Sequence, residues 1–142
     1  MEKIIIAVSG KYNTGKTTAL DMLKDQLTKK GLVDILYEPR SGKDFVTVLE
    51  YQKRIDGDKR VGIISAGDSE SEIEYGFKEI AKYDCDVIVC ATRCYGDTTK
   101  TVQSKADKSK AKLYIVGKWD TKNNNDTVEH ILGLAGKYID LK

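Results

Sequence analysis

GKYNTGKT, residues 10–17, is the stretch that decides the fold of this chain. It fits the pattern G-x-x-x-x-G-K-[ST] at every fixed position. The apolar run KIIIAVS, residues 3–9, precedes it, and residues 16–30 follow with three leucines on one helical face. Such a run is typical of a strand buried on both faces, and the leucine spacing is typical of an amphipathic helix. The sequence therefore predicts a strand, a glycine-rich loop and a helix in direct succession.

The residue types of this loop suit the binding of phosphate groups. Its two glycines allow the backbone to curl, so that successive N–H groups point inward at phosphate oxygens. Lys16 supplies positive charge to the β- and γ-phosphates, Thr17 offers a hydroxyl to Mg²⁺, and Thr18 can donate to the α-phosphate. The start of the helix adds its positive dipole end. We therefore expect a nucleoside triphosphate with Mg²⁺ to be bound by Gly10, Lys11, Tyr12, Asn13, Thr14, Gly15, Lys16, Thr17 and Thr18.

This loop resembles the phosphate-binding motif of P-loop NTPases, and the resemblance covers the first 30 residues. It implies a P-loop fold and a Mg²⁺-dependent nucleotide, with ATP expected on its prevalence in the superfamily and GTP as the alternative. Lys11 adds a resemblance to the partition-type dimeric ATPases, whose pattern G-K-G-G-x-G-K-T has a lysine at this place. That resemblance implies a homodimer in which Lys11 reaches across to the partner; a chance lysine is the alternative. Tyr12 and Asn13 stand where those ATPases have two glycines.

Two further residues are candidates for the chemistry. P-loop enzymes need an acidic residue to hold a magnesium-bound water, and Asp68 follows the strand-like run at residues 61–65, with the Gly67 N–H beside it. The alternative is that Asp68 caps the next helix. Arg93 follows the run at residues 86–91, where a guanidinium can stabilise charge on a transferring phosphoryl group or grip an anionic substrate. A solvated loop arginine is the alternative, and Asp97 is a weaker candidate in the same loop.

The remaining pattern predicts an α/β fold for residues 1–142 as one domain. Apolar runs at 32–37, 86–91 and 112–117 predict strands, and these alternate with helices over 69–83 and near the C-terminus. Asp126 and Glu129 are expected to cap that last helix, and residues 98–110 predict a weak helix or an exposed loop. Asp56-Gly57 between two β-branched runs favours a hairpin over 44–65, with a short helix over 44–54 as the alternative. Together these elements predict a P-loop-like layered fold with a mainly parallel sheet of five to six strands.

The amino-acid composition limits the kinds of partner and the cellular location that we expect for this protein. Lys and Arg total 24 against 22 Asp and Glu, a net charge of +2, which gives no electrostatic case for nucleic acid or a membrane. The short N-terminal apolar run lacks a cleavage site for a signal peptide, so a cytoplasmic location is expected. The three cysteines lack Cys-x-x-Cys spacing and favour reduced thiols near a core over a zinc site. The single histidine, His130, is expected at the surface or the edge of the core.

Three functions follow from these residues. The first is an NTPase, a hydrolase whose turnover or bound state switches a partner or a dimer. The second is a small phosphotransferase, with Glu38, Arg40 and Arg93 holding an acceptor; Tyr37-Glu38-Pro39-Arg40 faintly resembles a segment of thymidylate kinases. The third is a nucleotide-sensing module without turnover. The segment 117–120, Gly-Lys-Trp-Asp, is similar to a degraded guanine-reading motif of GTPases, and chance explains it as well.

Overall fold

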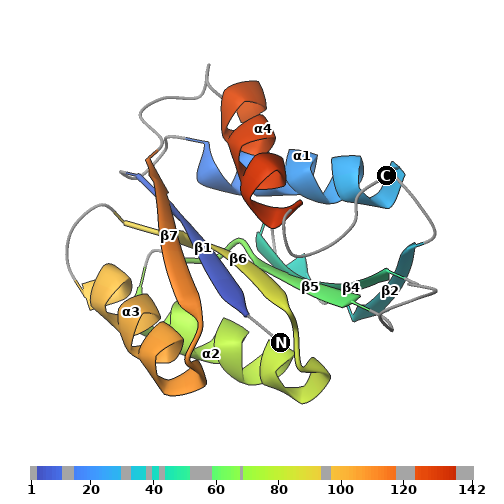
Figure 1. Ribbon diagram of the computed structural model, residues 1–142. Helices are drawn as coiled ribbons and strands as arrows, with labels where there is room; N and C mark the ends of the chain where they lie inside the picture. The colour runs from blue at the N-terminus through green and yellow to red at the C-terminus, as the bar shows by residue number, and fades with distance from the viewer. Residues whose placement is uncertain are drawn as a thin grey trace.

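The computed structural model describes residues 3–10, 15–29, 33–37, 40–41, 44–51, 59–67, 69–93, 97–117 and 124–136. Figure 1 labels most of the elements that these residues form. In chain order they are β1 (Ile4–Ser9), α1 (Lys16–Lys29), β2 (Val33–Tyr37), β3 (Arg40–Ser41), β4 (Asp44–Tyr51), β5 (Lys59–Ile64), α2 (Glu70–Ile80), the 3-10 helix η1 (Ala81–Tyr83), β6 (Val87–Thr92), α3 (Asp97–Ser109), β7 (Lys112–Gly117) and α4 (Asn124–Ala135).

The sheet is mixed, which corrects the prediction of a mainly parallel one. Its strand order is β2-β4-β5-β6-β1-β7, and the short β3 pairs with β4. β5, β6, β1 and β7 are parallel neighbours, whereas β4 pairs antiparallel with both β5 and β2. The cause is the hairpin, because β4 runs antiparallel to β5 and lies between β5 and β2 in the sheet. The strand expected over 32–37 is therefore an edge strand and not part of the parallel set.

The hairpin expected over residues 44–65 is confirmed. β4 and β5 pair from Val46 opposite Ile64 to Tyr51 opposite Lys59. Ser65 extends the pairing, since its backbone N–H donates to the Phe45 carbonyl oxygen at 3.0 Å and its hydroxyl accepts from the Phe45 N–H at 2.7 Å. The alternative of a short helix is wrong for residues 44–51, and the Asp56-Gly57 turn lies outside the described residues.

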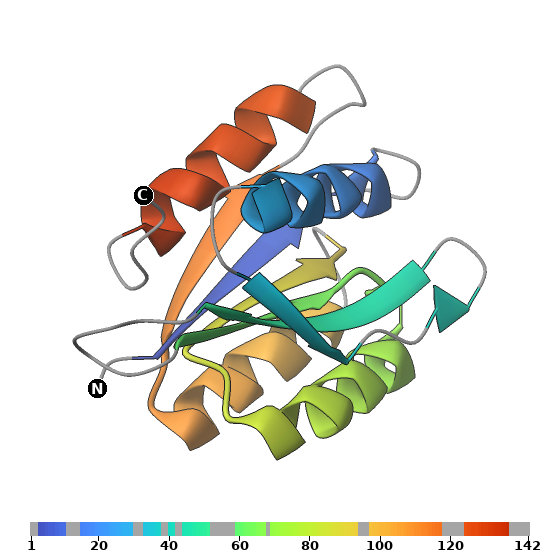
Figure 2. The ribbon, with the colours of Figure 1, turned by 90° about the vertical axis from the view of Figure 1, so that its right-hand side faces the viewer.

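Helices cover the sheet on both faces. Figures 1 and 2 show α1 and α4 on one face and α2 and α3 on the other. Alternate residues of β1 point to the two faces, so Ile4, Ile6 and Val8 pack with α1 and α4, whereas Ile5 and Ala7 pack with α2 and α3. All five side chains are buried, as the continuous apolar run predicts. β1 thus contributes side chains to two apolar cores.

Tyr51 ties α1 to the hairpin. Its hydroxyl donates a hydrogen bond to the carbonyl oxygen of Leu27 at 3.0 Å, near the end of α1. Burial raises the pKa of this phenol, because the apolar surroundings disfavour the phenolate. The bond satisfies a carbonyl in the last turn of the helix, where intrahelical donors run out.

Two helix boundaries differ from the sequence expectation. α3 is a regular helix from Asp97 to Ser109, where a weak helix or an exposed loop was expected, because Val102 and Ala106 bury a narrow apolar stripe in a polar sequence. α4 begins at Asn124, so Asp126 lies inside its first turn and neither Asp126 nor Glu129 is the N-cap. The helix expected from residue 69 is confirmed and begins after Ser69, whose side chain accepts from the Glu72 N–H at 3.2 Å.

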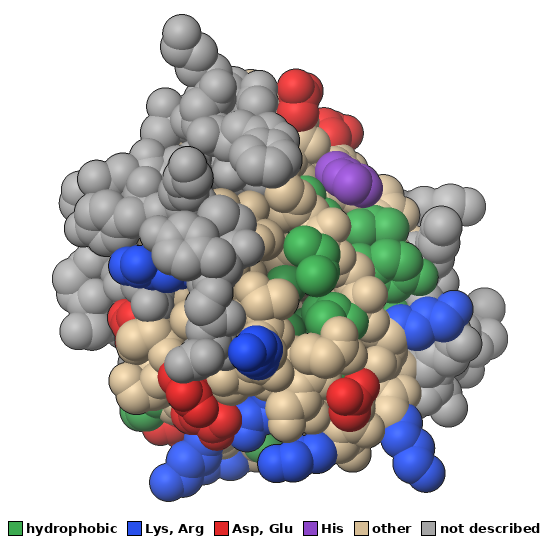
Figure 3. Space-filling view, turned by 90° about the vertical axis from the view of Figure 1, so that its left-hand side faces the viewer, with side chains coloured by type: hydrophobic (Ala, Val, Ile, Leu, Met, Phe, Trp, Pro, Cys, Tyr) green, Lys and Arg blue, Asp and Glu red, His purple; other side chains and the backbone are tan. Residues whose placement is uncertain are grey.

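The remaining sequence expectations concern single residues. Cys85 and Cys90 are buried free thiols, as expected, and Cys94 lies outside the described residues. His130 is exposed on α4 and appears in purple in Figure 3.

The two strands at the ends of the sheet order carry half-exposed apolar side chains, Ile35 on β2 and Ile115 on β7. Across the described ranges, none of the helices combines the length and the apolar character that crossing a bilayer requires.

Candidate functional site at the carboxyl edge of the sheet

The end of β1 and the start of α1 frame the predicted phosphate loop. Gly10 is buried and its N–H donates to the Thr92 carbonyl oxygen at 3.1 Å. Gly15 has φ = 85°, a conformation that glycine adopts without the steric cost of a side chain. The carbonyl of Gly15 accepts from the Ala19 N–H at 2.9 Å, so the helix begins directly after this turn. Four of the expected phosphate contacts, Lys11, Tyr12, Asn13 and Thr14, lie outside the described residues.

Lys16 is buried at this edge, with 7% of its surface exposed. Its ammonium group donates to the Gly10 carbonyl oxygen at 2.8 Å and to the Thr92 carbonyl oxygen at 2.9 Å. A buried charge is costly unless polar groups compensate it, and here two strand-end carbonyls do so. The side chain therefore bridges the carboxyl ends of β1 and β6, beside the N-terminus of α1. A cation in this place is suited to an anion that approaches the same edge.

Thr92 completes the contact between the two strands. It pairs with Ser9 in the parallel ladder, and its carbonyl accepts from both Gly10 and Lys16. Its own hydroxyl is fully buried and has no hydrogen-bond partner within the described part of the chain. A buried hydroxyl without a partner costs free energy. The group of Thr92 that contacts Lys16 is its backbone carbonyl, not this hydroxyl.

The backbone of Arg93 is fixed by three hydroxyl groups. Its N–H donates to the Thr98 Oγ1 at 3.0 Å, and its carbonyl accepts from the Thr99 Oγ1 at 2.9 Å and the Ser9 Oγ at 3.3 Å. These bonds join the end of β6 to the start of α3 and to β1. The structure therefore brings Arg93 to the strand next to the phosphate loop, with its side chain half-buried. Asp97 begins α3, and its side chain is not described.

The turn before Asp68 packs against this edge as well. A Cβ atom on Gly67 would lie 1.6 Å from the Ala91 carbonyl oxygen and 3.2 Å from the Thr92 nitrogen, so only a glycine fits there. This contact brings the end of β5 against the end of its neighbour β6. In the sheet order β6 lies between β5 and β1, so Gly67 is one strand away from the end of β1. Asp68 itself lies outside the described residues. Ser69 is the N-cap of α2, so the capping role considered for Asp68 belongs to its neighbour.

Thr17 and Thr18 follow Lys16 on the first turn of α1, with Thr17 half-buried and Thr18 exposed. A hydroxyl ligand and an electropositive helix start fit a nucleotide-bound Mg²⁺, which retains several waters and needs few protein ligands. The described residues contain no group of three or more His, Cys, Asp or Glu side chains close enough to hold a metal ion by themselves.

The other candidate segments lie at two places in the sheet, one at the end of β7 beside β1 and one on β2 and β3. Gly117 pairs with Ser9, so β7 ends at the same edge as β1, and residues 118–120 lie outside the described part. Tyr37 and Arg40 belong to β2 and β3, and β4, β5 and β6 lie between these strands and β1. Glu38 is outside the described residues. The structure thus places the backbone of Arg93 beside the end of β1 and leaves β2 and β3 at the far end of the sheet.

Sequence reasoning missed the hydroxyl-bearing residues of this edge: Ser9, Thr92, Thr98 and Thr99. The signal that could have found them is positional. Ser9 and Thr92 each occupy the last place of a buried strand, and parallel strands end at one edge of a sheet. Knowing that β1 and β6 are neighbours would have placed these two residues together, and that pairing is not visible in local sequence.

Comparisons with known proteins add nothing to this geometry, since the chain matches no family model, no curated protein and no solved structure at a significant level.

Proposed function

We propose that this protein binds a nucleoside triphosphate with Mg²⁺ through residues 10–18 and hydrolyses it, with ATP as the expected nucleotide. The observation that carries the proposal is the buried ammonium group of Lys16, held by the Gly10 and Thr92 carbonyls at the N-terminus of α1. Few structural roles require a lysine in such a place, because an apolar side chain would bury there at lower cost. The matching loop pattern supplies a reason for the charge.

The described residues have separate tasks in this proposal. Lys16 neutralises the β- and γ-phosphates, and the positive dipole end of α1 faces phosphate oxygens. Thr17 supplies a hydroxyl for Mg²⁺, which neutralises charge on the transferring phosphoryl group when bound. Arg93 directly follows the adjacent strand β6, and from there a guanidinium can stabilise the same charge. Asp68 is the proposed acidic partner of a magnesium-bound water.

Nucleotide binding by a Lys16→Ala variant tests the proposal. Loss of a charge-assisted hydrogen bond to phosphate should weaken Mg-ATP binding about ten- to hundredfold. The measurement is a fluorescence titration with a labelled ATP analogue, alongside release of free phosphate from γ-labelled ATP and GTP. The matched control is Lys29→Ala, which removes an exposed lysine from the other end of the same helix and should leave both readouts unchanged.

The outcomes separate the alternatives. Unchanged affinity in Lys16→Ala would contradict the binding proposal. Binding that depends on Lys16 without phosphate release would exclude hydrolysis and favour a phosphotransferase that lacks its acceptor, or a nucleotide sensor. An Asp68→Asn variant should keep nucleotide binding and lose the response to Mg²⁺, and a wild-type response would remove Asp68 from the site.

A further inference from the structure

A pocket of about 650 Å³ lies between α2 and α3, on the face of the sheet opposite to α1. It is independent of the carboxyl edge, because Lys3, Asp84 and Ala111 line it near the amino ends of β1, β6 and β7. Its volume is in the range of sites for small molecules, which span roughly 300–1,000 Å³. We call it the α2–α3 pocket.

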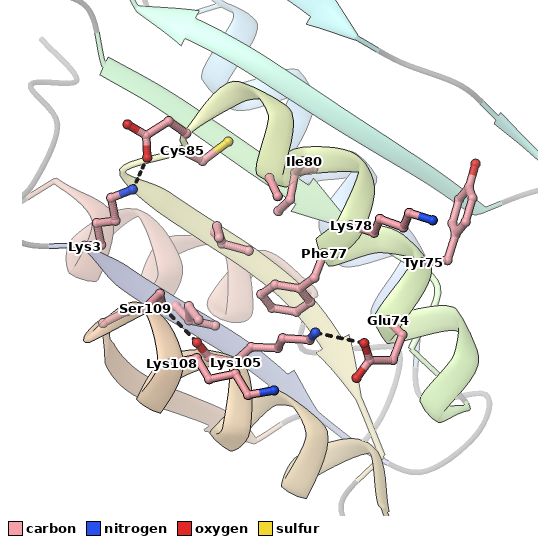
Figure 4. A pocket seen from close by; sticks show the side chains of 15 residues that line it. Lys3, Glu74, Tyr75, Phe77, Lys78, Ile80, Cys85, Lys105, Lys108 and Ser109 are labelled. Atoms are coloured by element: carbon pink, nitrogen blue, oxygen red, sulfur yellow. Dashed lines mark hydrogen bonds and ion pairs between the residues drawn. The ribbon is translucent and has the colours of Figure 1, made fainter.

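The floor and walls of this pocket are apolar. Ile5 and Ile88 come from the sheet, Phe77 and Ile80 from α2, and Ala111 from the segment before β7. Ile88 and Ala111 are only partly buried, although they pack against the core of this face. Figure 4 shows the Phe77 ring between the two helices. The core on this face is thus open toward the pocket, and an apolar ligand body would complete its burial.

Lysines dominate the charged side chains that line the pocket. Glu74 on α2 pairs with Lys105 on α3, with 2.8 Å between the ammonium nitrogen and a carboxylate oxygen, and Lys3 pairs with Asp84. Figure 4 shows Lys105 reaching across from α3 to Glu74. Lys108, one turn further along α3, has no acidic partner in the described part of the chain. The lining therefore offers positive charge beyond what its own carboxylates neutralise.

We propose that the α2–α3 pocket binds a small free carboxylate with an aliphatic or aromatic body. The body would fill the apolar floor, and the carboxylate would accept hydrogen bonds from Lys105 and Lys108, with Lys105 exchanging Glu74 for the ligand. A half-exposed pair such as Glu74–Lys105 contributes little to stability, so its exchange costs little. Charge complementarity selects an anion, and the volume of the pocket selects a small molecule over an extended surface.

Octanoate and octan-1-ol are the matched probes, because they share a chain and differ in charge. Titration of each into the full-length protein, followed by NMR of isoleucine methyl groups, should give saturable octanoate binding at Ile5 and Ile88. Lys105→Met with Lys108→Met keeps the apolar stems and should weaken octanoate binding about tenfold or more. Octan-1-ol affinity should change less than about twofold in that variant, because it lacks the charge.

Two controls keep the test decisive. The Lys29→Met, Lys100→Met double variant removes the same charge from exposed sites outside the pocket and should bind octanoate as wild type does. Ala111→Leu adds apolar bulk to the floor and should abolish the binding of both probes. Absence of saturable octanoate binding, or binding indifferent to Lys105 and Lys108, would overturn the proposal. If the protein does not bind octanoate but sediments with phosphatidylglycerol vesicles in a way that depends on Lys105 and Lys108, the proposal is overturned. The ligand of these lysines would then be a membrane surface.

Discussion

Two regions of this molecule hold lysine ammonium groups in opposite ways. At the carboxyl edge, Lys16 is buried and its partners include two backbone carbonyls that the strand pairing fixes in place. In the α2–α3 pocket, Lys105 is held by a carboxylate on a neighbouring helix, and both side chains reach solvent. Backbone partners keep their positions when a ligand arrives, whereas a side-chain partner can rotate away. The first arrangement is built before binding, and the second is an exchangeable contact.

The two faces of the sheet show the same contrast in packing. α1 and α4 close a core in which Ala19, Leu20 and Leu23 have 0–1% of their surface exposed. α2 and α3 leave a pocket over the same sheet, with Ile88 and Ala111 partly exposed in it. Both faces bury their core side chains, and the α2–α3 face also keeps a pocket. The following variants test whether this difference in packing is real and how large it is.

Thiol reactivity tests whether the pocket wall has the character of protein interior. Burial raises the pKa of Cys85, which lines the pocket, to about 12, and the nearby Asp86 carboxylate adds to the shift; burial alone raises that of Cys90 to about 12. In a Cys94→Ser background, both thiols should react with iodoacetamide at pH 8 about a thousandfold more slowly than an unhindered cysteine. Fast alkylation of Cys85 with Cys90 still protected would show that water fills the pocket.

The same two thiols give the fold a defined pH dependence. Their pKa values are higher in the folded chain than the ordinary value of 9.0, so the unfolded state loses protons first as the pH rises. Their stabilising contribution is complete below about pH 9 and is lost as the pH approaches 12. The urea midpoint should therefore fall between pH 8 and pH 10.5, and it should fall less in a Cys90→Ala variant.

A methyl group on Gly67 tests how tightly the carboxyl edge is packed. The added carbon would overlap the Ala91 carbonyl, which belongs to a strand and cannot move aside, so Gly67→Ala should lower the free energy of unfolding by about 3 kcal/mol. Gly133→Ala is the matched control, because no atom lies within 4 Å of its added carbon. That control should stabilise α4 by about 0.5–1 kcal/mol. Urea unfolding followed by circular dichroism measures both, and similar values would refute the close contact at Gly67.

Enlarging one alanine on each face gives the smallest effect and the most direct comparison. Ala19 is fully buried on α1, so Ala19→Leu should cost about 2 kcal/mol of unfolding free energy. Ala111 lines the pocket, so Ala111→Leu should change that free energy by less than about 0.5 kcal/mol. Thermal and urea unfolding of the two variants supply the numbers. Equal costs would mean that the α2–α3 face is packed as densely as the other.

The sequence predicted local features well and neighbour relations poorly. The strand β1, the helix α1, the β4–β5 pairing and the Ser69 cap depend on nearby residues, and all four are present in the described ranges. The position of β2 depends on which strand still has an unpaired edge after the hairpin forms. The periodicity of the sequence does not indicate which strand that is. The contact of Thr92 with Lys16 could not be predicted from the sequence for the same reason, because it joins segments far apart in the chain.

For the candidate site as well, local features could be predicted from the sequence and contacts between distant segments could not. The motif predicts Lys16 as a phosphate-binding residue, and the structure adds its burial at the ends of β1 and β6. The rule that ligands lie beyond the carboxyl ends of strands predicts Arg93; the structure places its backbone beside the end of β1, and its role stays a prediction. The α2–α3 pocket had no sequence signal, because its lining comes from five separate elements and consists of common residue types.

The pairing of β1 has a consequence for the order of folding. This strand precedes both of its partners by more than 75 residues, since they lie at residues 87–92 and 112–117. Neither side of β1 can pair until those segments have left the ribosome, so its apolar residues stay without their strands while the intervening chain is made. Long-range parallel pairing of this kind is slow and exposes aggregation-prone segments. The chain should therefore depend on protection of its first strand during synthesis more than a protein whose neighbouring strands are also neighbours in sequence.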